Sequence, residues 1–245
     1  MAAEDSLRPA FYALAPGGWR DWVTVLHPPY TAWHLAYVVI GAALAPELHV
    51  SRLLLTLAAF FLAVGLGAHA LDELHGRPLG TRLSAGALTA VAAASVAGAV
   101  AVGVYASVAW TPWLAPFVAA GGFLVLAYNL ELAGGRFHTD LWFALSWGAF
   151  PVLTAYVALA ERLDWAPVFA AVFAAASSLA QRHLSTQVRD VRRRVRSVSG
   201  TIVRQDGAEE PVTAETLITA EERALRMFTI AMPAVAVALV MMRVT

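Results

Sequence analysis

Residues 53–78 read LLLTLAAFFLAVGLGAHALDELHGRP. The first part, residues 53–71, contains no Asp, Glu, Lys or Arg and is long enough to cross a hydrocarbon core of about 30 Å as a helix. The remainder carries Asp72, Glu73, His75 and Arg77 within six positions. This stretch therefore predicts a transmembrane helix that ends in a cluster of ionisable side chains.

The composition of the whole chain agrees with this prediction. Of 245 residues, 59% are hydrophobic and 14% are charged, whereas about 25% of the residues in a soluble domain are charged. The composition excludes a disordered chain and indicates an integral membrane protein. The sequence contains no cysteine, which excludes disulfides, thiolate metal sites and cysteine nucleophiles.

Apolar runs of membrane-crossing length recur along the chain and predict an all-α, polytopic membrane helix bundle with about seven transmembrane helices. The expected spans are Tyr30 to Pro46, Leu53 to Leu71, Leu83 to Val108, Trp113 to Leu132, Leu141 to Ala160, Trp165 to Ala180 and Leu225 to Met242. The predicted divisions are an N-terminal segment with an interfacial helix (1–29), a six-helix membrane core with two polar motif loops (30–180), an Arg-rich cytoplasmic loop (181–222) and a final transmembrane helix (223–245).

The basic residues predict the orientation of these spans. All 17 are arginines, and the seven-span arrangement places 14 on one side and only Arg52, Arg162 and Arg243 on the other. Because positive residues concentrate in cytoplasmic loops, we expect a cytoplasmic N-terminus. The Ala-rich and Arg-rich, lysine-free usage favours the inner membrane of a prokaryote.

The first polar group follows the second expected span. On a helix, His69, Asp72 and Glu73 share a face, and His75 lies one turn beyond Asp72. Two carboxylates flanked by imidazoles, with Arg77 close behind, are suited to hold a divalent cation or bind a phosphate. The alternative is a helix end with solvated charges.

A second polar group follows the fourth expected span, and the predicted topology places it at the same membrane face. Carboxylate oxygens for magnesium, with arginines to offset the remaining negative charge, are what a magnesium-bridged diphosphate requires. The second group consists of Tyr128, Asn129, Glu131, Arg136, His138 and Asp140.

Three segments resemble the UbiA-type intramembrane prenyltransferases. Residues 27–45 are similar to the first span of that family, and residues 69–78 occupy the place of its first aspartate-rich motif, N-D-x-x-D-x-x-x-D. Residues 128–156 are similar to its second motif region, above all in the dihydroxynaphthoate prenyltransferase branch. The chain keeps Asp72 alone of the four positions in the first motif, and in the second it keeps Asp140 but has Ala144 four residues later.

The resemblance implies transfer of a prenyl group from an allylic isoprenoid diphosphate to a lipid-like acceptor. It implies that Asp72, Glu73 and Asp140 are the catalytic residues and the ligands of Mg²⁺. It further implies a substrate-binding set composed of His69, His75, Arg77, Tyr128, Asn129, Arg136 and His138.

Two other functions stay open. The incomplete motifs are compatible with a degenerate, non-catalytic relative that binds an isoprenoid lipid or a partner membrane enzyme. The seven histidines and several carboxylates leave room for a seven-span, metal-dependent membrane hydrolase. The expected surroundings are membrane lipids, and no motif indicates nucleic-acid binding.

Overall fold

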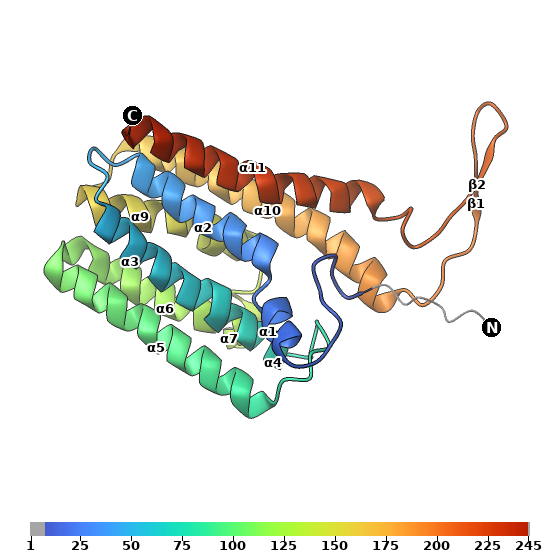
Figure 1. Ribbon diagram of the computed structural model, residues 1–245, viewed down its shortest axis with the longest axis horizontal. Coiled ribbons are helices and arrows are strands. Elements are labelled where there is room, and N and C mark those ends of the chain that lie inside the picture. The colour runs from blue at the N-terminus through green and yellow to red at the C-terminus, as the bar shows by residue number, and fades with distance from the viewer. Residues whose placement is uncertain (1–7, 245) are drawn as a thin grey trace.

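The computed structural model describes residues 8–244 (Figure 1), so residues 1–7 of the expected N-terminal segment and Thr245 lie outside the described chain. The elements are α1 (Trp19–Val25), α2 (Pro28–Ala43), α3 (Val50–Phe60), η1 (Phe61–Ala68), α4 (His69–Leu74), α5 (Ala85–Ala109), η2 (Pro112–Leu114), α6 (Ala115–Asn129), α7 (Leu132–Gly135), α8 (Asp140–Phe143), η3 (Ala144–Ala149), α9 (Phe150–Ala160), α10 (Trp165–Arg194), β1 (Thr201–Val203), β2 (Glu209–Pro211) and α11 (Thr219–Val244).

The prediction of an all-α membrane bundle is confirmed in its class. Five helical stretches among residues 8–244 are long and apolar enough to cross a membrane. Two of the expected spans do not meet this criterion, because α2 has only 16 residues and the second half of α10 is rich in arginine. The count of seven spans stays a prediction. The five stretches are Val50–Leu74, Ala85–Ala109, Pro112–Asn129, Asp140–Ala160 and Thr219–Arg243.

Helix α2 lies near the middle of the bundle. It packs against α9 on one side and α11 on another, so the first long helix contacts the last one (Figure 1). Trp33 and Tyr37 of α2 are fully buried, in one hydrophobic cluster with Val152 of α9 and Leu225 of α11. Burial of large aromatic side chains is among the largest apolar contributions to a core.

Two glycines allow helices of this core to approach closely. A Cβ atom at Gly41 of α2 would lie 2.2 Å from the backbone oxygen of Val152. A Cβ atom at Gly148 would lie 2.5 Å from the backbone oxygen of Ala174, on α10. In a membrane the hydrophobic effect does not drive helices together, so their association depends on close packing. Small residues at the crossing allow the two backbones to approach.

Two of the membrane-length helices change to π-helical hydrogen bonding partway along. Segment η1 continues α3 and leads into α4, and segment η3 lies between α8 and α9. In a π-helix each amide N–H bonds five residues back, which widens the turn, and such turns occur often at functional sites.

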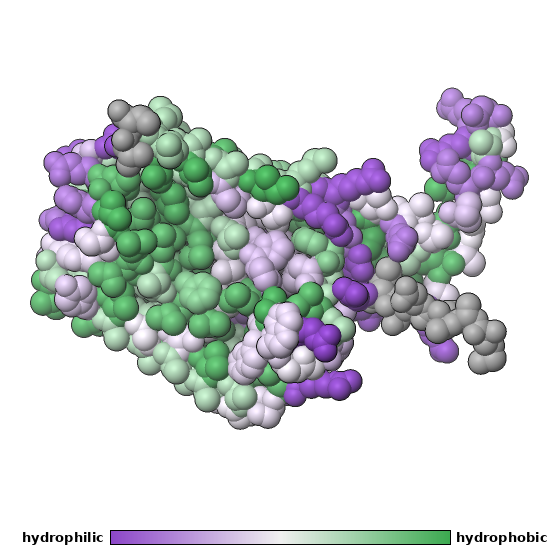
Figure 2. All heavy atoms as spheres, in the orientation of Figure 1, coloured by the Kyte–Doolittle hydropathy of each residue, from purple (hydrophilic) through white to green (hydrophobic). Residues whose placement is uncertain are grey.

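The surface is divided into bands along the bundle axis. Figure 2 shows a hydrophobic region on one face of the bundle with hydrophilic residues at both ends. The three arginines that the predicted topology separates from the other 14 lie together at one end of the bundle. Arg52 bonds Glu161 at 2.8 Å, Arg162 bonds Asp164 at 2.8 Å, and Arg243 bonds the carbonyl of Ala45 at 3.0 Å.

The prediction of one long loop over residues 181–222 was wrong for its first part. Helix α10 continues to Arg194, and a β-hairpin of β1 and β2 follows, with Thr201 paired to Pro211. The hairpin stands away from the bundle in Figure 1. The sequence was misread here because the apolar run ends near residue 180 while the helix continues as an amphipathic one.

Candidate functional site

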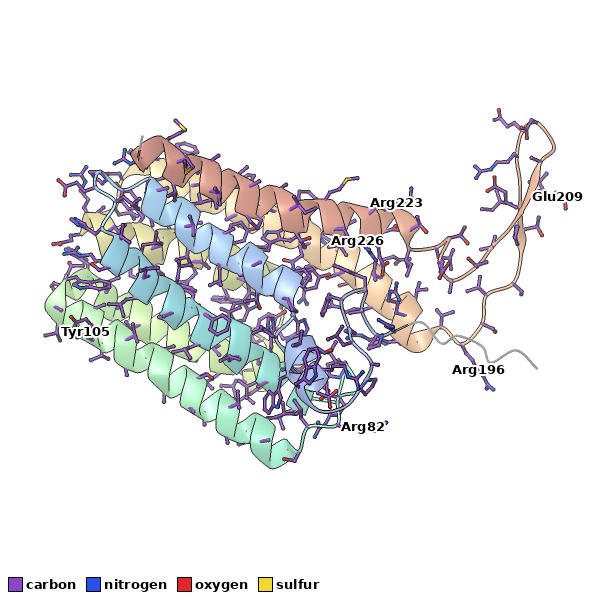
Figure 3. The ribbon with its side chains drawn as sticks, viewed as in Figure 1. Arg82, Tyr105, Arg196, Glu209, Arg223 and Arg226 are labelled. Carbon is purple, nitrogen blue, oxygen red and sulfur yellow. The ribbon has the colours of Figure 1, made fainter. Side chains whose placement is uncertain are left out.

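The candidate site lies at the end of the bundle that also carries the hairpin, and we call it the basic end. Figure 3 shows Arg82, Arg196, Arg223 and Arg226 toward this end, with Tyr105 at the opposite end. The basic end is formed by α1, α4, the connections that follow α4 and α6, and the second half of α10. It therefore brings together the regions of the two predicted polar groups.

One face of α10 lines the basic end with arginines. Arg182, Arg189 and Arg193 are spaced at i, i+7 and i+11, which places them on the same side of a helix. Arg192, on the adjacent face, pairs with Glu222 and so ties α10 to α11. The sequence predicts a loop here whose cluster from Arg189 to Arg196 could bind anionic lipid head groups, and it does not place these residues beside the two polar groups, although their spacing was a helical signal.

A pair of stacked imidazoles forms the centre of the site. The rings of His27 and His69 are 4.2 Å apart between centroids and inclined by 15°. The hydroxyl of Tyr12 shares a hydrogen bond of 2.7 Å with His27 Nδ1. His27 Nε2 is buried and has no hydrogen-bond partner among the described residues. A buried polar atom of this kind is costly unless a further group satisfies it.

The local backbone explains the position of His27. It precedes Pro28 and Pro29, which begin α2, and it takes a left-handed conformation with φ 47°. Proline favours the first turn of a helix, and a left-handed residue reverses the chain just before it. His27 is thereby turned back over α4, where it meets His69.

Asp72 is the acidic member of the site. It is partly buried, and no hydrogen bond or ion pair to its carboxylate occurs within the described part of the chain. Among the basic side chains, Arg189 and Arg193 have the largest electrostatic effect on Asp72, ahead of His138. Tyr12, His27, His69, Asp72, Arg189 and Arg193 thus form one cluster, which we call the basic site.

Glu73, although adjacent to Asp72, has a structural position. Its side chain is 0% exposed. One carboxylate oxygen accepts a hydrogen bond from the Leu79 amide at 2.9 Å, and the other accepts from the amide and the hydroxyl of Thr81. Glu73 therefore holds the connection after α4 in place, and the geometry gives no support to its expected role as a metal ligand.

The second polar group surrounds Tyr128 at the end of α6. The ring of His138 stacks on Tyr128 with centroids 4.3 Å apart. Arg182 bonds the Tyr128 hydroxyl and pairs with Asp140 at 2.5 Å. Asp140 is thus an ion-pair partner that positions Arg182. The pair joins the start of α8 to α10.

The remaining predicted residues are distributed around this group. His75 Nε2 lies 3.9 Å from a carboxylate oxygen of Glu131, so the two polar groups meet at this end of the bundle. Arg77 donates to the carbonyl of Leu83 at 2.5 Å. Asn129 donates to the carbonyl of Val125, one turn earlier in α6. Arg136 is exposed, and the structure does not bring it into the basic site.

The donor set does not fit a shared magnesium site. Across residues 8–244 no three His, Asp or Glu side chains group so that they could hold a metal ion. Of the three predicted ligands, Glu73 bonds the loop after α4 and Asp140 pairs with Arg182. Asp72 is left without a second carboxylate available to share a cation, whereas magnesium prefers several oxygen ligands in octahedral geometry.

Burial of the imidazole fixes the charge state of His27. Desolvation lowers the pKa of His27 well below its ordinary value, and His69, Arg193, Arg189 and His34 lower it further. His27 is therefore neutral at pH 7. The two arginines then exceed Asp72 by one positive charge, so the basic site attracts an anion.

The same pKa shift predicts acid sensitivity. As the pH falls below about 6.5, the unfolded chain binds a proton at His27 before the folded chain does, so the free energy of unfolding decreases. We expect thermal unfolding in detergent to show this loss between pH 7 and pH 5. His27→Gln should reduce the slope of the unfolding midpoint against pH. His49→Gln, at an exposed position near the opposite end, should leave this slope unchanged. An unchanged slope in His27→Gln would contradict the shifted pKa.

The fold and the site define the class of the protein as a mostly helical bundle with membrane-length apolar helices and a basic polar end. No protein-family model matches the chain, and the searches of curated proteins and of solved structures found no match.

Proposed function

We propose that the protein binds, from within the membrane, a lipid with a phosphate or diphosphate head group, and that the basic site holds this head. The observation that carries the proposal is the pair Arg189 and Arg193. They lie one helical turn apart, and neither has a carboxylate within ion-pair distance among the described residues. Arginine is suited to bidentate recognition of phosphate oxygens.

The physical state of Arg193 supports an anionic ligand. Desolvation lowers the pKa of Arg193, and the neighbouring Arg189 lowers it further. Its Nε donates to the carbonyl of Pro9, a neutral partner that does not offset the charge. Two guanidinium groups close together repel each other, and a phosphate between them would convert this repulsion into two attractive contacts.

The resemblance to UbiA-type enzymes supports an isoprenoid diphosphate as the ligand to test. We expect detergent-purified protein to bind geranylgeranyl diphosphate and to bind geranylgeraniol, the neutral alcohol with the same chain, much more weakly. Isothermal titration calorimetry at constant detergent concentration measures both. Titration with inorganic diphosphate alone separates the contribution of the head group to the affinity from that of the prenyl chain.

The double variant Arg189→Ala, Arg193→Ala should bind geranylgeranyl diphosphate about 100-fold more weakly, because each lost charge-assisted hydrogen bond contributes about 1.5 kcal/mol. Arg194→Ala is the matched control, since that side chain lies on the same helix but is 82% exposed and paired with Asp190. Equal affinity in the double variant and the wild type would refute the proposed head-group site.

Prenyl transfer is the second candidate, and the carboxylate of Asp72 favours it. Asp72 lies in the basic site without a bonded partner in residues 8–244, so it is free to contact a substrate or a cation. The two candidates differ in their response to magnesium. A binding protein should hold the diphosphate equally well in EDTA, whereas magnesium-dependent binding that is lost in Asp72→Asn would support the transferase.

A further inference from the structure

A cavity of about 100 Å³ lies inside the bundle, between the α3–η1 helix, α5, α6 and the η3–α9 helix. None of the residues of the basic site lines it, so it is a separate feature of the molecule. Its lining is almost entirely hydrophobic. Its lining includes Phe60, Phe117, Phe150, Ala99, Val118 and Ser146.

The size and the lining of the cavity suit a small apolar group. An engineered cavity of about 150 Å³ lined by aliphatic and aromatic side chains stays dry and binds benzene, and the present volume is of the same order. Phe60, Phe117 and Phe150 contribute aromatic walls. Glycines at positions 103, 121 and 122 also line the cavity, and a Cβ atom there would meet the side chains of Val118, Phe150 and Val100.

One polar atom in the wall lacks a partner. Ser146 is 3% exposed, and its hydroxyl has no hydrogen bond to any described residue. Thr154, the other hydroxyl in the lining, donates to the carbonyl of Phe150 at 2.7 Å. Burying a hydroxyl without a partner is unfavourable. Ser146 is therefore the position at which a ligand would be recognised.

The direction of Ser146 follows from its place in η3. Gly148 faces α10, because its Cβ position lies 2.5 Å from the oxygen of Ala174. A residue two positions earlier in a helix points to roughly the opposite side. Ser146 accordingly faces away from α10 and into the cavity that it lines.

Both π-helical segments contribute to this cavity. Ala63 and Val64 of η1 line one side, and Ser146 and Trp147 of η3 line another. The backbone oxygen of Trp147 accepts a hydrogen bond of 3.0 Å from His34 Nδ1, on α2. π-helical turns are rare and occur often at functional sites. Two of them line this one cavity.

A groove between α5 and α6 adjoins the cavity on the lipid side. The groove has a volume of about 460 Å³ and shares Val100, Val118 and Gly122 with the cavity wall. Val104 and Val108, which line the groove, are 52% and 85% exposed. A molecule dissolved in the bilayer therefore reaches the cavity wall without crossing water.

From these observations we infer a second binding site, at this cavity, for a neutral molecule from the bilayer. Its apolar part, of the size of one aromatic ring, fills the space among Phe60, Phe117 and Phe150, and a single hydrogen-bonding atom contacts the hydroxyl of Ser146. This inference does not depend on the proposed function, since the cavity and the basic site share no residue.

The test uses two ring-sized probes that differ by one hydroxyl group, 4-fluorophenol and fluorobenzene, with detergent-purified full-length protein. ¹⁹F NMR measures saturable binding of each probe. The wild type should bind both. Ser146→Ala should weaken 4-fluorophenol about fivefold and change fluorobenzene by less than about twofold, because one neutral hydrogen bond is lost.

Filling the cavity should abolish saturable binding of both probes. Ala99→Phe fills it from α5, and Val118→Phe fills it from α6, so one variant suffices if the other does not fold. Val172→Phe adds the same bulk at a 62% exposed position on α10 and should bind as the wild type does. Saturable binding that survives in a folded cavity-filled variant, or no saturable binding to the wild type, would overturn the inference.

Discussion

Replacing Glu73 with alanine is expected to lower the free energy of unfolding by about 4 kcal/mol. The buried carboxylate accepts three hydrogen bonds from Leu79 and Thr81, and its loss leaves those donors without an acceptor. For a chain of this length the midpoint of thermal unfolding should fall by roughly 10 °C. Thermal unfolding in detergent, followed by circular dichroism, measures the change.

The adjacent carboxylate provides a matched control. Asp72 lies in the same helical turn, but its carboxylate forms no hydrogen bond or ion pair within residues 8–244. Asp72→Asn should therefore shift the unfolding midpoint by no more than about 2 °C, since the side chain keeps its size and no hydrogen bond or ion pair of the carboxylate is lost. Equal effects of Glu73→Ala and Asp72→Asn would show that Glu73 does not hold the loop.

Gly41→Ala is the second substitution with a large expected effect. The added methyl group would lie 2.2 Å from the backbone oxygen of Val152, and a backbone atom cannot turn aside as a side chain can. Helices α2 and α9 would have to separate, and we expect a loss of about 3 kcal/mol in the free energy of unfolding. Unfolding in a series of SDS concentrations measures this difference.

Gly86→Ala is the control for Gly41→Ala, and it should raise the free energy of unfolding instead of lowering it. The Cβ position at Gly86, near the start of α5, has no atom within 4 Å. Because alanine restricts the unfolded chain more than glycine does, the substitution should stabilise by about 0.5 kcal/mol. Destabilisation by Gly86→Ala as large as that by Gly41→Ala would contradict the close crossing of α2 and α9.

The helices with long apolar runs were predictable from the sequence. The expected span from Leu53 to Leu71 lies within the helix Val50–Leu74, and the expected span from Leu141 to Ala160 lies within Asp140–Ala160. Hydrophobicity determines these helices because every backbone polar group in a membrane must be bonded within the segment. The π-helical turns inside them were not predictable, since they depend on tertiary packing rather than on local composition.

The site was predicted in part, and the errors have physical causes. The two polar groups, which the predicted topology places at one membrane face, meet through His75 and Glu131. The partners of each carboxylate were not predictable, because Asp72 and Glu73 are adjacent in the sequence and carry the same charge. In the fold, Glu73 bonds the loop after α4, whereas the Asp72 carboxylate lies in the basic site. The basic residues that matter most, Arg189 and Arg193, lay in a segment expected to be a loop.

The N-terminal residues of the basic site were missed for a different reason. Tyr12 and His27 lie in a short segment before α2, and nothing local in their sequence shows which helix they contact. Their positions depend on α4 and on the second half of α10, which come much later in the chain. Contacts between such distant residues are set by the completed fold.

This separation along the chain has a consequence for biosynthesis. The basic site combines Tyr12 and His27 with Arg189 and Arg193, so it cannot assemble until most of the chain has left the ribosome. At 5–20 residues per second this takes roughly 10 to 40 s. Throughout that interval α2 lacks α11, whose Leu225 shares its buried cluster. The earliest long helix to be made is therefore stabilised by the last, and a ribosome that stalls late leaves α2 without its final neighbour.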